Sequence, residues 1–246
     1  MGDYSDKTAV ITGGGAGMGF ALAKLLVDGG ARVVVTGRSA ATLDAARSLG
    51  PHAVGVRGDV AATADLQVLA DRVADELGRI DALFVNAGIA AATPFGSITE
   101  QAYDELFAIN VKGAFFTVQT LAPLLARGAG VVLTTSAANA IGMLDTSVYA
   151  AGKAALRSMA RSFSRELLPR GIRVNAISPG PIDTGVLEKT MPAEAAARFV
   201  AQVVAENPMQ RFGTVEEFAK AAAFLAFDAT YTTGAELSVD GGRTQL

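Results

Sequence analysis

The chain contains 246 residues, of which half are hydrophobic and 18% are charged, and its formal net charge is −3. This composition excludes a disordered chain, and the acidic balance without a basic stripe predicts no nucleic-acid partner. Because the chain has no cysteine and its one histidine is His52, disulfides, thiolate catalysis and a metal site built on several imidazoles are excluded.

Short apolar runs with little alternation recur along the chain and predict parallel strands that are buried on both faces. These runs are Thr8–Thr12, Arg32–Thr36, Ala53–Arg57, Ala82–Val85, Val131–Thr135, Arg173–Ile177 and Glu236–Val239. Helix-period stretches lie between them, at Gly17–Asp28, Thr63–Leu77, Thr99–Ala126, Tyr149–Leu168 and Val215–Phe227. The alternation predicts an α/β fold: a Rossmann-type, doubly wound sheet of seven parallel strands with helices on both faces, in a single domain.

The segment 178–208 interrupts this rhythm, because it is longer than an ordinary connection between a strand and a helix. It contains four prolines and an amphipathic stretch, Ala193–Glu206. We expect a substrate lid at about residues 183–208.

The polar N-terminus lacks the apolar core of a signal peptide, and no uncharged run is apolar enough to span a bilayer. We therefore expect a cytoplasmic protein with no membrane partner.

A glycine-rich turn follows the first predicted strand and opens the first predicted helix. Its candidate phosphate-binding residues are Gly13, Gly15, Gly17, Met18 and Gly19. Glycines permit a tight turn and a close approach of phosphate to the backbone, and the free amides at a helix start attract an anion. A flexible turn is the alternative, but the position after a buried strand near the N-terminus favours a nucleotide site.

The second predicted strand is followed by Arg38 and Ser39, where NAD-preferring folds carry an acidic residue for the ribose 2′-hydroxyl. Here Gly37 precedes them and the next acid is Asp44. Arg38 can bind a 2′-phosphate and stack on adenine, so NADP(H) is favoured and NAD(H) remains possible. The alternative for Arg38 is a solvated surface side chain.

Two more strand ends carry candidate cofactor residues. After the third strand, Asp59 could accept a hydrogen bond from the adenine amino group, with Val60 against the ring; a turn aspartate is the alternative. After the fourth strand, Asn86, Ala87 and Gly88 are small enough for the backbone to approach the cofactor.

The candidate catalytic residues are Ser136, Tyr149 and Lys153. Tyr149 and Lys153 are four residues apart, so they share one face of a helix, and a nearby ammonium favours the phenolate. Tyr149 is therefore a candidate general acid/base for a carbonyl/alcohol couple. Ser136, at the end of the fifth strand, could hydrogen-bond the substrate oxygen. A strand-end turn serine and a solvated helix face are the structural alternatives.

Together these residues resemble a classical short-chain dehydrogenase/reductase, over nearly the whole chain from Thr12 to Gly242. The elements that carry the resemblance occur in family order: Gly13, Gly17 and Gly19; Asp59; Asn86, Ala87 and Gly88; Asn110; Ser136; Tyr149 and Lys153; Pro179 and Gly180; and Val239–Gly242.

The resemblance implies roles for individual residues. The residue matching Tyr149 transfers the proton, and the match of Lys153 holds the nicotinamide ribose and lowers the pKa of the tyrosine. Asn110 would hold a water in a proton relay; an asparagine at a helix kink that bonds nearby backbone is its alternative. Nicotinamide contacts are implied for Pro179, Gly180, Ile182 and Thr184.

Three positions depart from the family pattern: Val85, Phe20 and Ala16. Ala16 stands where many NADP(H) users place a basic residue, which leaves Arg38 alone to recognise a 2′-phosphate.

The expected substrate is a neutral, rather apolar ketone or aldehyde, or the corresponding alcohol, because 90–95 and 138–144 contain no lysine or arginine. Expected pocket residues are Ala138, Ile141, Met143, Leu144, Val186, Leu187, Met191 and Phe199.

The resemblance implies a homotetramer, and the small residues of 150–155 could permit close packing between helices. The alternatives are an NAD-dependent alcohol dehydrogenase of the same family, a non-catalytic nucleotide-binding protein and a redox-free lyase. The retained glycines and Lys153 argue against the lyase.

Overall fold

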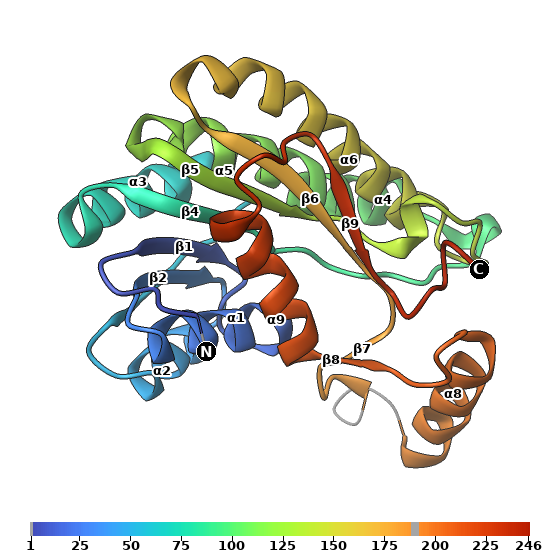
Figure 1. Cartoon of the computed structure of the whole chain (residues 1–246). Helices are drawn as coiled ribbons and strands as arrows, with labels where there is room; N and C mark the ends of the chain where they lie inside the picture. The colour runs from blue at the N-terminus through green and yellow to red at the C-terminus, as the bar shows by residue number, and fades with distance from the viewer. Residues whose placement is uncertain (1, 188–191) are drawn as a thin grey trace.

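The computed structural model describes residues 2–187 and 192–246, and its centre is a sheet of seven parallel strands (Figure 1). The strands are β1 (Thr8–Thr12), β2 (Arg32–Gly37), β3 (Ala53–Arg57), β4 (Ile80–Val85), β5 (Leu125–Thr134), β6 (Arg173–Pro179) and β9 (Glu236–Val239). Their order across the sheet is β3-β2-β1-β4-β5-β6-β9. The predicted doubly wound α/β fold is thereby confirmed.

Helices cover both faces of this sheet (Figure 1). One layer contains α1 (Gly17–Asp28), α2 (Ala41–Ser48) and α9 (Val215–Ala223), and the other contains α3 (Thr63–Leu77), α4 (Glu100–Phe107), α5 (Gly113–Leu121) and α6 (Ser147–Leu167). Successive strand residues face opposite layers, so Val10 packs with one apolar cluster and Ile11 with the other. Strands buried on both faces explain the uninterrupted apolar runs of the sequence.

The prediction of one helix over Thr99–Ala126 is wrong. A π-helical turn, Ala108–Lys112, separates α4 from α5, and β5 begins at Leu125 rather than at Val131. The turn coincides with Asn110, whose side chain is hydrogen-bonded to backbone outside the helix. Pro123, in the short 3-10 helix Ala122–Leu124, ends the helical segment because proline lacks the amide hydrogen a helix interior needs.

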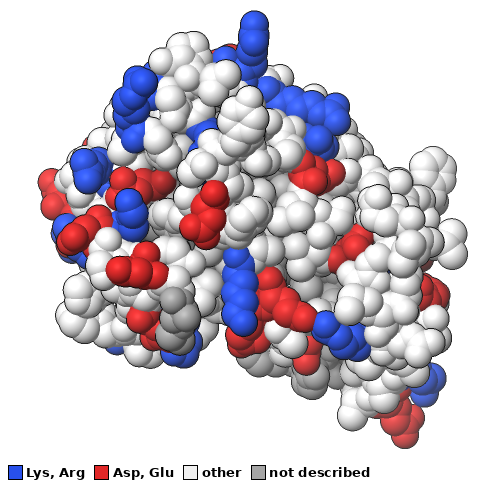
Figure 2. Space-filling view, in the orientation of Figure 1, with Lys and Arg blue, Asp and Glu red and all other residues white. Residues whose placement is uncertain are grey.

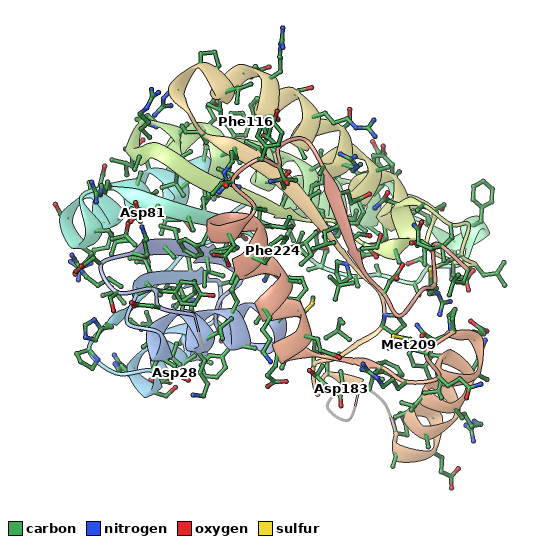
Figure 3. The ribbon with its side chains drawn as sticks, viewed as in Figure 1. Asp28, Asp81, Phe116, Asp183, Met209 and Phe224 are labelled. Atoms are coloured by element: carbon green, nitrogen blue, oxygen red, sulfur yellow. The ribbon has the colours of Figure 1, made fainter. Side chains whose placement is uncertain are left out.

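The segment between β6 and β9 carries its own helix, α8 (Ala193–Glu206), which lies apart from the helices that cover the sheet (Figure 1). Two short strands, β7 (Ile182–Asp183) and β8 (Gly213–Thr214), pair in parallel at its base. Figure 3 shows Asp183 and Met209 on the chain segments that lead to and from α8. Helix α8 coincides with the amphipathic stretch seen in the sequence, whereas strands of two residues were not predicted.

Within the described ranges, no helix has the length and apolar character needed to cross a membrane. Figure 2 shows acidic and basic side chains interspersed over the face in view.

Candidate active site

The candidate catalytic residues come together at the carboxyl edge of the sheet. Ser136 follows the end of β5, and Tyr149 and Lys153 lie one turn apart near the start of α6. Ser136 and Tyr149 line a cavity of about 720 Å³, which also reaches α8 and the segment after β6. Parallel sheets bind ligands at this edge, where the strand order reverses.

Lys153 lies beside Tyr149. Its side chain is buried, its Nζ donates a hydrogen bond to the Thr134 carbonyl oxygen at 2.8 Å, and the same Nζ lies 5.8 Å from the centre of the Tyr149 ring. Burial disfavours the ammonium and lowers the pKa of Lys153 to about 8. A cation held beside the phenol at neutral pH can therefore lose its proton in a moderately alkaline solution.

Tyr149 has a pKa above its usual value because burial disfavours the phenolate, and a hydrogen bond with Ser136 opposes this effect. The resemblance implies that Lys153 lowers this pKa. Burial is nevertheless the largest effect on this pKa, and the Lys153 ammonium donates its hydrogen bond to the Thr134 carbonyl. Tyr149 is thus protonated at neutral pH, the state a proton donor requires.

Glu236, which sequence reasoning missed, fixes the segment around Ser136. Its carboxylate accepts hydrogen bonds from Thr135 Oγ1 at 2.6 Å and from Asn139 Nδ2 at 3.0 Å. The same carboxylate forms an ion pair with Arg157 of α6 at 3.3 Å. Because Glu236 begins β9, far along the chain, no local pattern points to this link.

Asn110 lies in the π-helical turn and is fully buried. Its Oδ1 accepts a hydrogen bond from the Ile89 amide and its Nδ2 donates one to the Ile89 carbonyl, both at 2.8 Å. This is the backbone-bonding alternative that the sequence left open. Gly88 adjoins it: a Cβ added there would lie 3.1 Å from Asn110 Oδ1 and 3.5 Å from Lys153 Nζ.

The glycine-rich turn fits a phosphate. Gly13 and Gly17 have positive φ angles of 68° and 51°, and a Cβ on Gly13 would lie 3.0 Å from Ala87 Cα. A Cβ on Gly19 would collide with the Gly13 carbonyl oxygen. Helix α1 starts at the N-cap Ala16 without a side-chain cap and without an acidic residue in its first turn. Its first amides are therefore free to bind an anion, as a dinucleotide pyrophosphate requires.

Neighbouring side chains pack closely around the rest of this turn. Gly15 packs against Thr42, whose Oγ1 would lie 2.8 Å from an added Cβ. The side chain of Met18 packs on the apolar cluster around α1, so only its main chain can face the turn. Thr184, at the start of the expected lid, lies against Gly17, 3.3 Å from where a Cβ would stand.

Asn86 joins the ends of three strands. Its Nδ2 donates to the Thr12 carbonyl at 3.3 Å, and its Oδ1 accepts from Thr134 Oγ1 at 3.3 Å. The amide of Ala87 donates to Thr12 Oγ1 at 3.0 Å. These bonds hold the turn after β4 close to the glycine-rich turn.

Arg38 and Ser39 are exposed beyond β2, and Ser39 Oγ accepts a hydrogen bond from the Ala41 amide at the start of α2. A second arginine, missed by sequence reasoning, lies beside them. Arg57 ends β3 in register with Gly37, and its Nε donates to the Arg38 carbonyl at 3.0 Å. The signal that could have found Arg57 is its place at the end of the next strand along the chain.

Asp59 and Val60 begin the turn after β3. Asp59 Oδ1 accepts from the Ala61 amide at 2.9 Å, which is the turn geometry the sequence left as an alternative, and the Asp59 amide donates to Asp65 at 2.7 Å. The side chain of Val60 is buried and packs on Gly113.

The cavity lining includes most of the expected residues. Pro179, Gly180, Ile182 and Thr184 line it, as do the apolar residues Ala138, Met143, Leu144, Val186, Leu187 and Phe199. Ile141 is not part of the lining, and Met191 lies outside the described residues, as does part of the expected lid. The structure adds charged groups that the sequence did not point to, from α8 and the C-terminal segment: Glu206 and Arg243.

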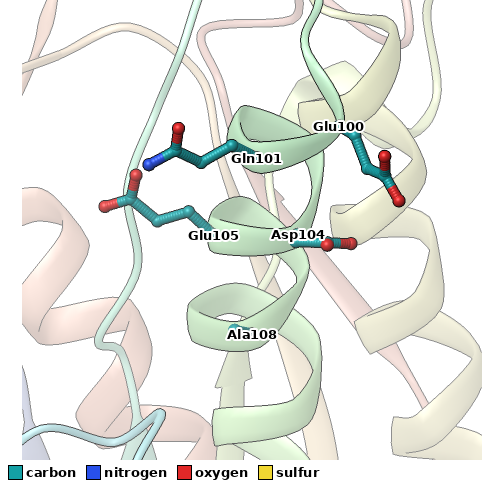
Figure 4. Close-up of a pocket in the computed structure, with 5 residues that line it drawn as sticks. All are labelled: Glu100, Gln101, Asp104, Glu105 and Ala108. Carbon is teal, nitrogen blue, oxygen red and sulfur yellow. The ribbon is translucent and has the colours of Figure 1, made fainter.

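A separate surface hollow lies on α4 (Figure 4). Its lining consists of Glu100, Gln101, Asp104, Glu105 and Ala108. It contains neither Ser136 nor Tyr149, so the cavity at the sheet edge is the candidate active site.

Comparisons with known proteins identify relatives over nearly the whole chain. Residues 13–244 match a family model described as Enoyl-(Acyl carrier protein) reductase. The chain is 43% identical over 244 residues to Oxidoreductase asL5 of Sarocladium schorii, covering 98% of this chain and 96% of that protein. It is 36% identical to cis-4-hydroxycyclohexanecarboxylate dehydrogenase of Sinomonas cyclohexanicum over the full length of both proteins.

A solved structure from Brucella melitensis, a short-chain dehydrogenase/reductase described as a glucose/ribitol dehydrogenase, superposes with a TM-score of 0.93. It is 31% identical in sequence, and the match covers all of both chains. The fold and these similarities define an NAD(P)-dependent oxidoreductase that acts between an alcohol and a carbonyl. The chain belongs to the short-chain dehydrogenase/reductase family.

Proposed function

We propose that this protein is an NADP(H)-dependent reductase of a neutral, rather apolar ketone or aldehyde, with Tyr149 as general acid/base. The observation that carries the proposal is the cavity at the sheet edge, where Ser136 and Tyr149 share a largely apolar lining and the buried Lys153 lies beside Tyr149. In the cell we expect a cytoplasmic homotetramer.

In this proposal Ser136 donates a hydrogen bond to the carbonyl oxygen and orients it. Tyr149 gives its proton to that oxygen in reduction and takes it back in alcohol oxidation. The nicotinamide cofactor, when bound, supplies the hydride or receives it. Lys153 would hold the ribose hydroxyls and favour the phenolate left on Tyr149. The side-chain amide of Asn110 is engaged with Ile89, so Asn110 would hold a relay water through its main chain.

The remaining candidate residues surround the cofactor in family order. The glycine-rich turn (Gly13, Gly15, Gly17, Met18, Gly19) would bind the pyrophosphate. Asp59 and Val60 would adjoin the adenine, and Asn86, Ala87 and Gly88 the ribose. The nicotinamide would lie against Pro179, Gly180, Ile182 and Thr184.

The preference for NADP(H) rests on two arginines. Arg38 and Arg57 are exposed at neighbouring strand ends, and Arg57 is hydrogen-bonded to the main chain of Arg38. Two guanidinium groups there suit the doubly charged 2′-phosphate that distinguishes NADPH from NADH.

A side-by-side titration of the protein with NADPH and NADH, followed by coenzyme fluorescence, tests this preference. We expect NADPH to bind at least about tenfold more tightly, and Arg38→Leu or Arg57→Leu to remove about tenfold of that preference. Arg47→Leu, on the exposed side of α2, is the matched control and should change neither affinity. Tighter binding of NADH would instead support the NAD-dependent alcohol dehydrogenase, and binding of neither would contradict both.

A further inference from the structure

An ion pair between α8 and the C-terminal segment forms part of the cavity wall. Glu206 is the last residue of α8, and Arg243 lies in the segment after β9. Arg243 Nη2 donates to Glu206 Oε2 at 3.1 Å, and Gln202 Nε2 donates to Glu206 Oε1 at 2.9 Å. Both members of the pair line the cavity that contains Ser136 and Tyr149.

The two partners differ in exposure. The side chain of Arg243 is 15% exposed, whereas that of Glu206 is 48% exposed. Hydrogen bonds from Gln202 and Arg243 lower the pKa of Glu206, so its carboxylate is ionised at neutral pH. A largely enclosed guanidinium is therefore neutralised by a carboxylate that borders solvent.

The rest of the described lining adds no second cation. Asp145 and Asp183 also line the cavity, so three carboxylates stand against one guanidinium, and that guanidinium already has a partner. An anionic substrate would meet this excess of negative charge in a partly enclosed space, where charges are screened less than in bulk water.

From this arrangement we infer that Glu206 is a specificity-determining residue: it occupies Arg243 and thereby excludes substrates that carry a carboxylate. Arg243 is then a latent anion-binding group, which becomes available when the charge of Glu206 is removed. The inference rests on the proposed function, because it concerns which carbonyl compounds the same cavity accepts.

Two probes of nearly equal shape measure the effect: 4-oxocyclohexanecarboxylate and its neutral amide, 4-oxocyclohexanecarboxamide. The quantity of interest is the ratio of kcat/KM for the acid to that for the amide. Glu206→Gln keeps a side chain of the same size but no longer holds Arg243 in an ion pair. We expect the ratio to rise at least about tenfold in this variant, because Arg243 can then form one charged hydrogen bond with the carboxylate of the acid. Glu206→Ala is the second variant.

Two further variants identify the group responsible. Glu206→Gln combined with Arg243→Gln should lose the gain, because no guanidinium remains for the acid. Asp145→Asn is the matched control: it removes a carboxylate from the same lining without freeing Arg243, so the ratio should change less than about threefold. Asparagine also tolerates the positive φ of 61° at this position.

Binding gives a readout that does not require turnover. Ligand-observed NMR titrations with cyclohexanecarboxylate and cyclohexanecarboxamide should show the same selective gain for the acid in Glu206→Gln. An unchanged acid-to-amide ratio in both assays overturns the inference, and so does a gain that persists in the double variant. If the wild type reduces no carbonyl compound at all, the proposed function fails instead, and the binding titration alone decides the role of Glu206.

Discussion

Lys153 shows how burial of one residue governs chemistry and stability together. Its ammonium is enclosed and has the Thr134 carbonyl as its hydrogen-bond acceptor. Its pKa falls from 10.5 to about 8 because water no longer stabilises the charge. The folded protein therefore gives up this proton at a lower pH than the unfolded chain does.

This difference predicts how stability changes with pH. Between pH 8 and 10.5 the unfolded lysine keeps its proton while the folded one loses it, so the unfolded state binds more protons and stability rises with pH. Relative to Lys153→Met, the wild type should gain about 2 kcal/mol of unfolding free energy between about pH 7 and about pH 9.5. Urea unfolding of both proteins at the two pH values measures this, and an unchanged difference would show that Lys153 has an ordinary pKa.

The sequence was sufficient to predict the positions of residues that lie close together along the chain. The four-residue separation of Tyr149 and Lys153 follows from helix geometry, and the structure puts both on α6. Arg57, Arg243 and Glu236 were missed because their importance depends on register or on contacts between distant segments. Arg57, for example, reaches Arg38 only because β3 pairs with β2 so that Arg57 stands opposite Gly37.

Among the elements, the π-helical turn Ala108–Lys112 does most to shape the site. It lets Asn110 turn toward Ile89 and form two hydrogen bonds with its backbone. Such turns are frequent at functional sites because they redirect side chains within a helix. A π-helical turn contains one residue more than an α-helical turn. The apolar spacing of α4 and α5 gives no sign of this extra residue, so periodicity alone predicts a continuous helix here.

Asn110→Ala tests the structural part of this account. It leaves the Ile89 amide and carbonyl without partners, so the unfolding free energy should fall by about 1–3 kcal/mol. Gln67→Ala serves as the control, because Gln67 makes a solvent-exposed hydrogen bond to Asp71 on α3, and its effect should stay below about 0.5 kcal/mol. Equal stability of the two variants would contradict a structural role for Asn110.

Substitution of Gly19 tests whether the glycine-rich turn binds the coenzyme. An alanine Cβ would collide with the Gly13 carbonyl and lie 2.8 Å from Asn86 Nδ2, so the turn would have to shift. We expect Gly19→Ala to weaken coenzyme binding at least about tenfold, whereas Gly96→Ala, where nothing lies within 4 Å, should leave it unchanged. Coenzyme fluorescence titration compares the two, and equal affinities would place the pyrophosphate elsewhere.

At the scale of the whole molecule, the sheet was predictable because seven short strands that alternate with helices permit few topologies. The arrangement around α8 was not, since β7 and β8 are too short to produce a sequence pattern. The stretch 150–155 was proposed as a surface between subunits. Only part of this stretch can contact another subunit, because Gly152 packs against Leu106 within the chain. Ala151 and Ala154 are exposed.

This exposure predicts which substitution disrupts an assembly. A homotetramer should scatter light with a mass four times that of the chain, and Ala154→Arg should lower that mass because α6 would no longer pack closely. Val68→Arg, on the exposed side of α3, is the matched control and should leave the mass unchanged. A monomer at micromolar concentration would defeat the tetramer proposal.

The most direct test of the central claim is the turnover of Tyr149→Phe with NADPH and the neutral ketone that the wild type reduces fastest. Loss of the phenol hydroxyl should lower kcat by at least about 10³-fold while coenzyme affinity stays within about threefold of wild type. Tyr103→Phe, which removes a hydroxyl from a ring stacked on Phe107, should retain full turnover. If Tyr149→Phe keeps a substantial part of the wild-type rate, Tyr149 is not the proton donor and the proposed mechanism is wrong.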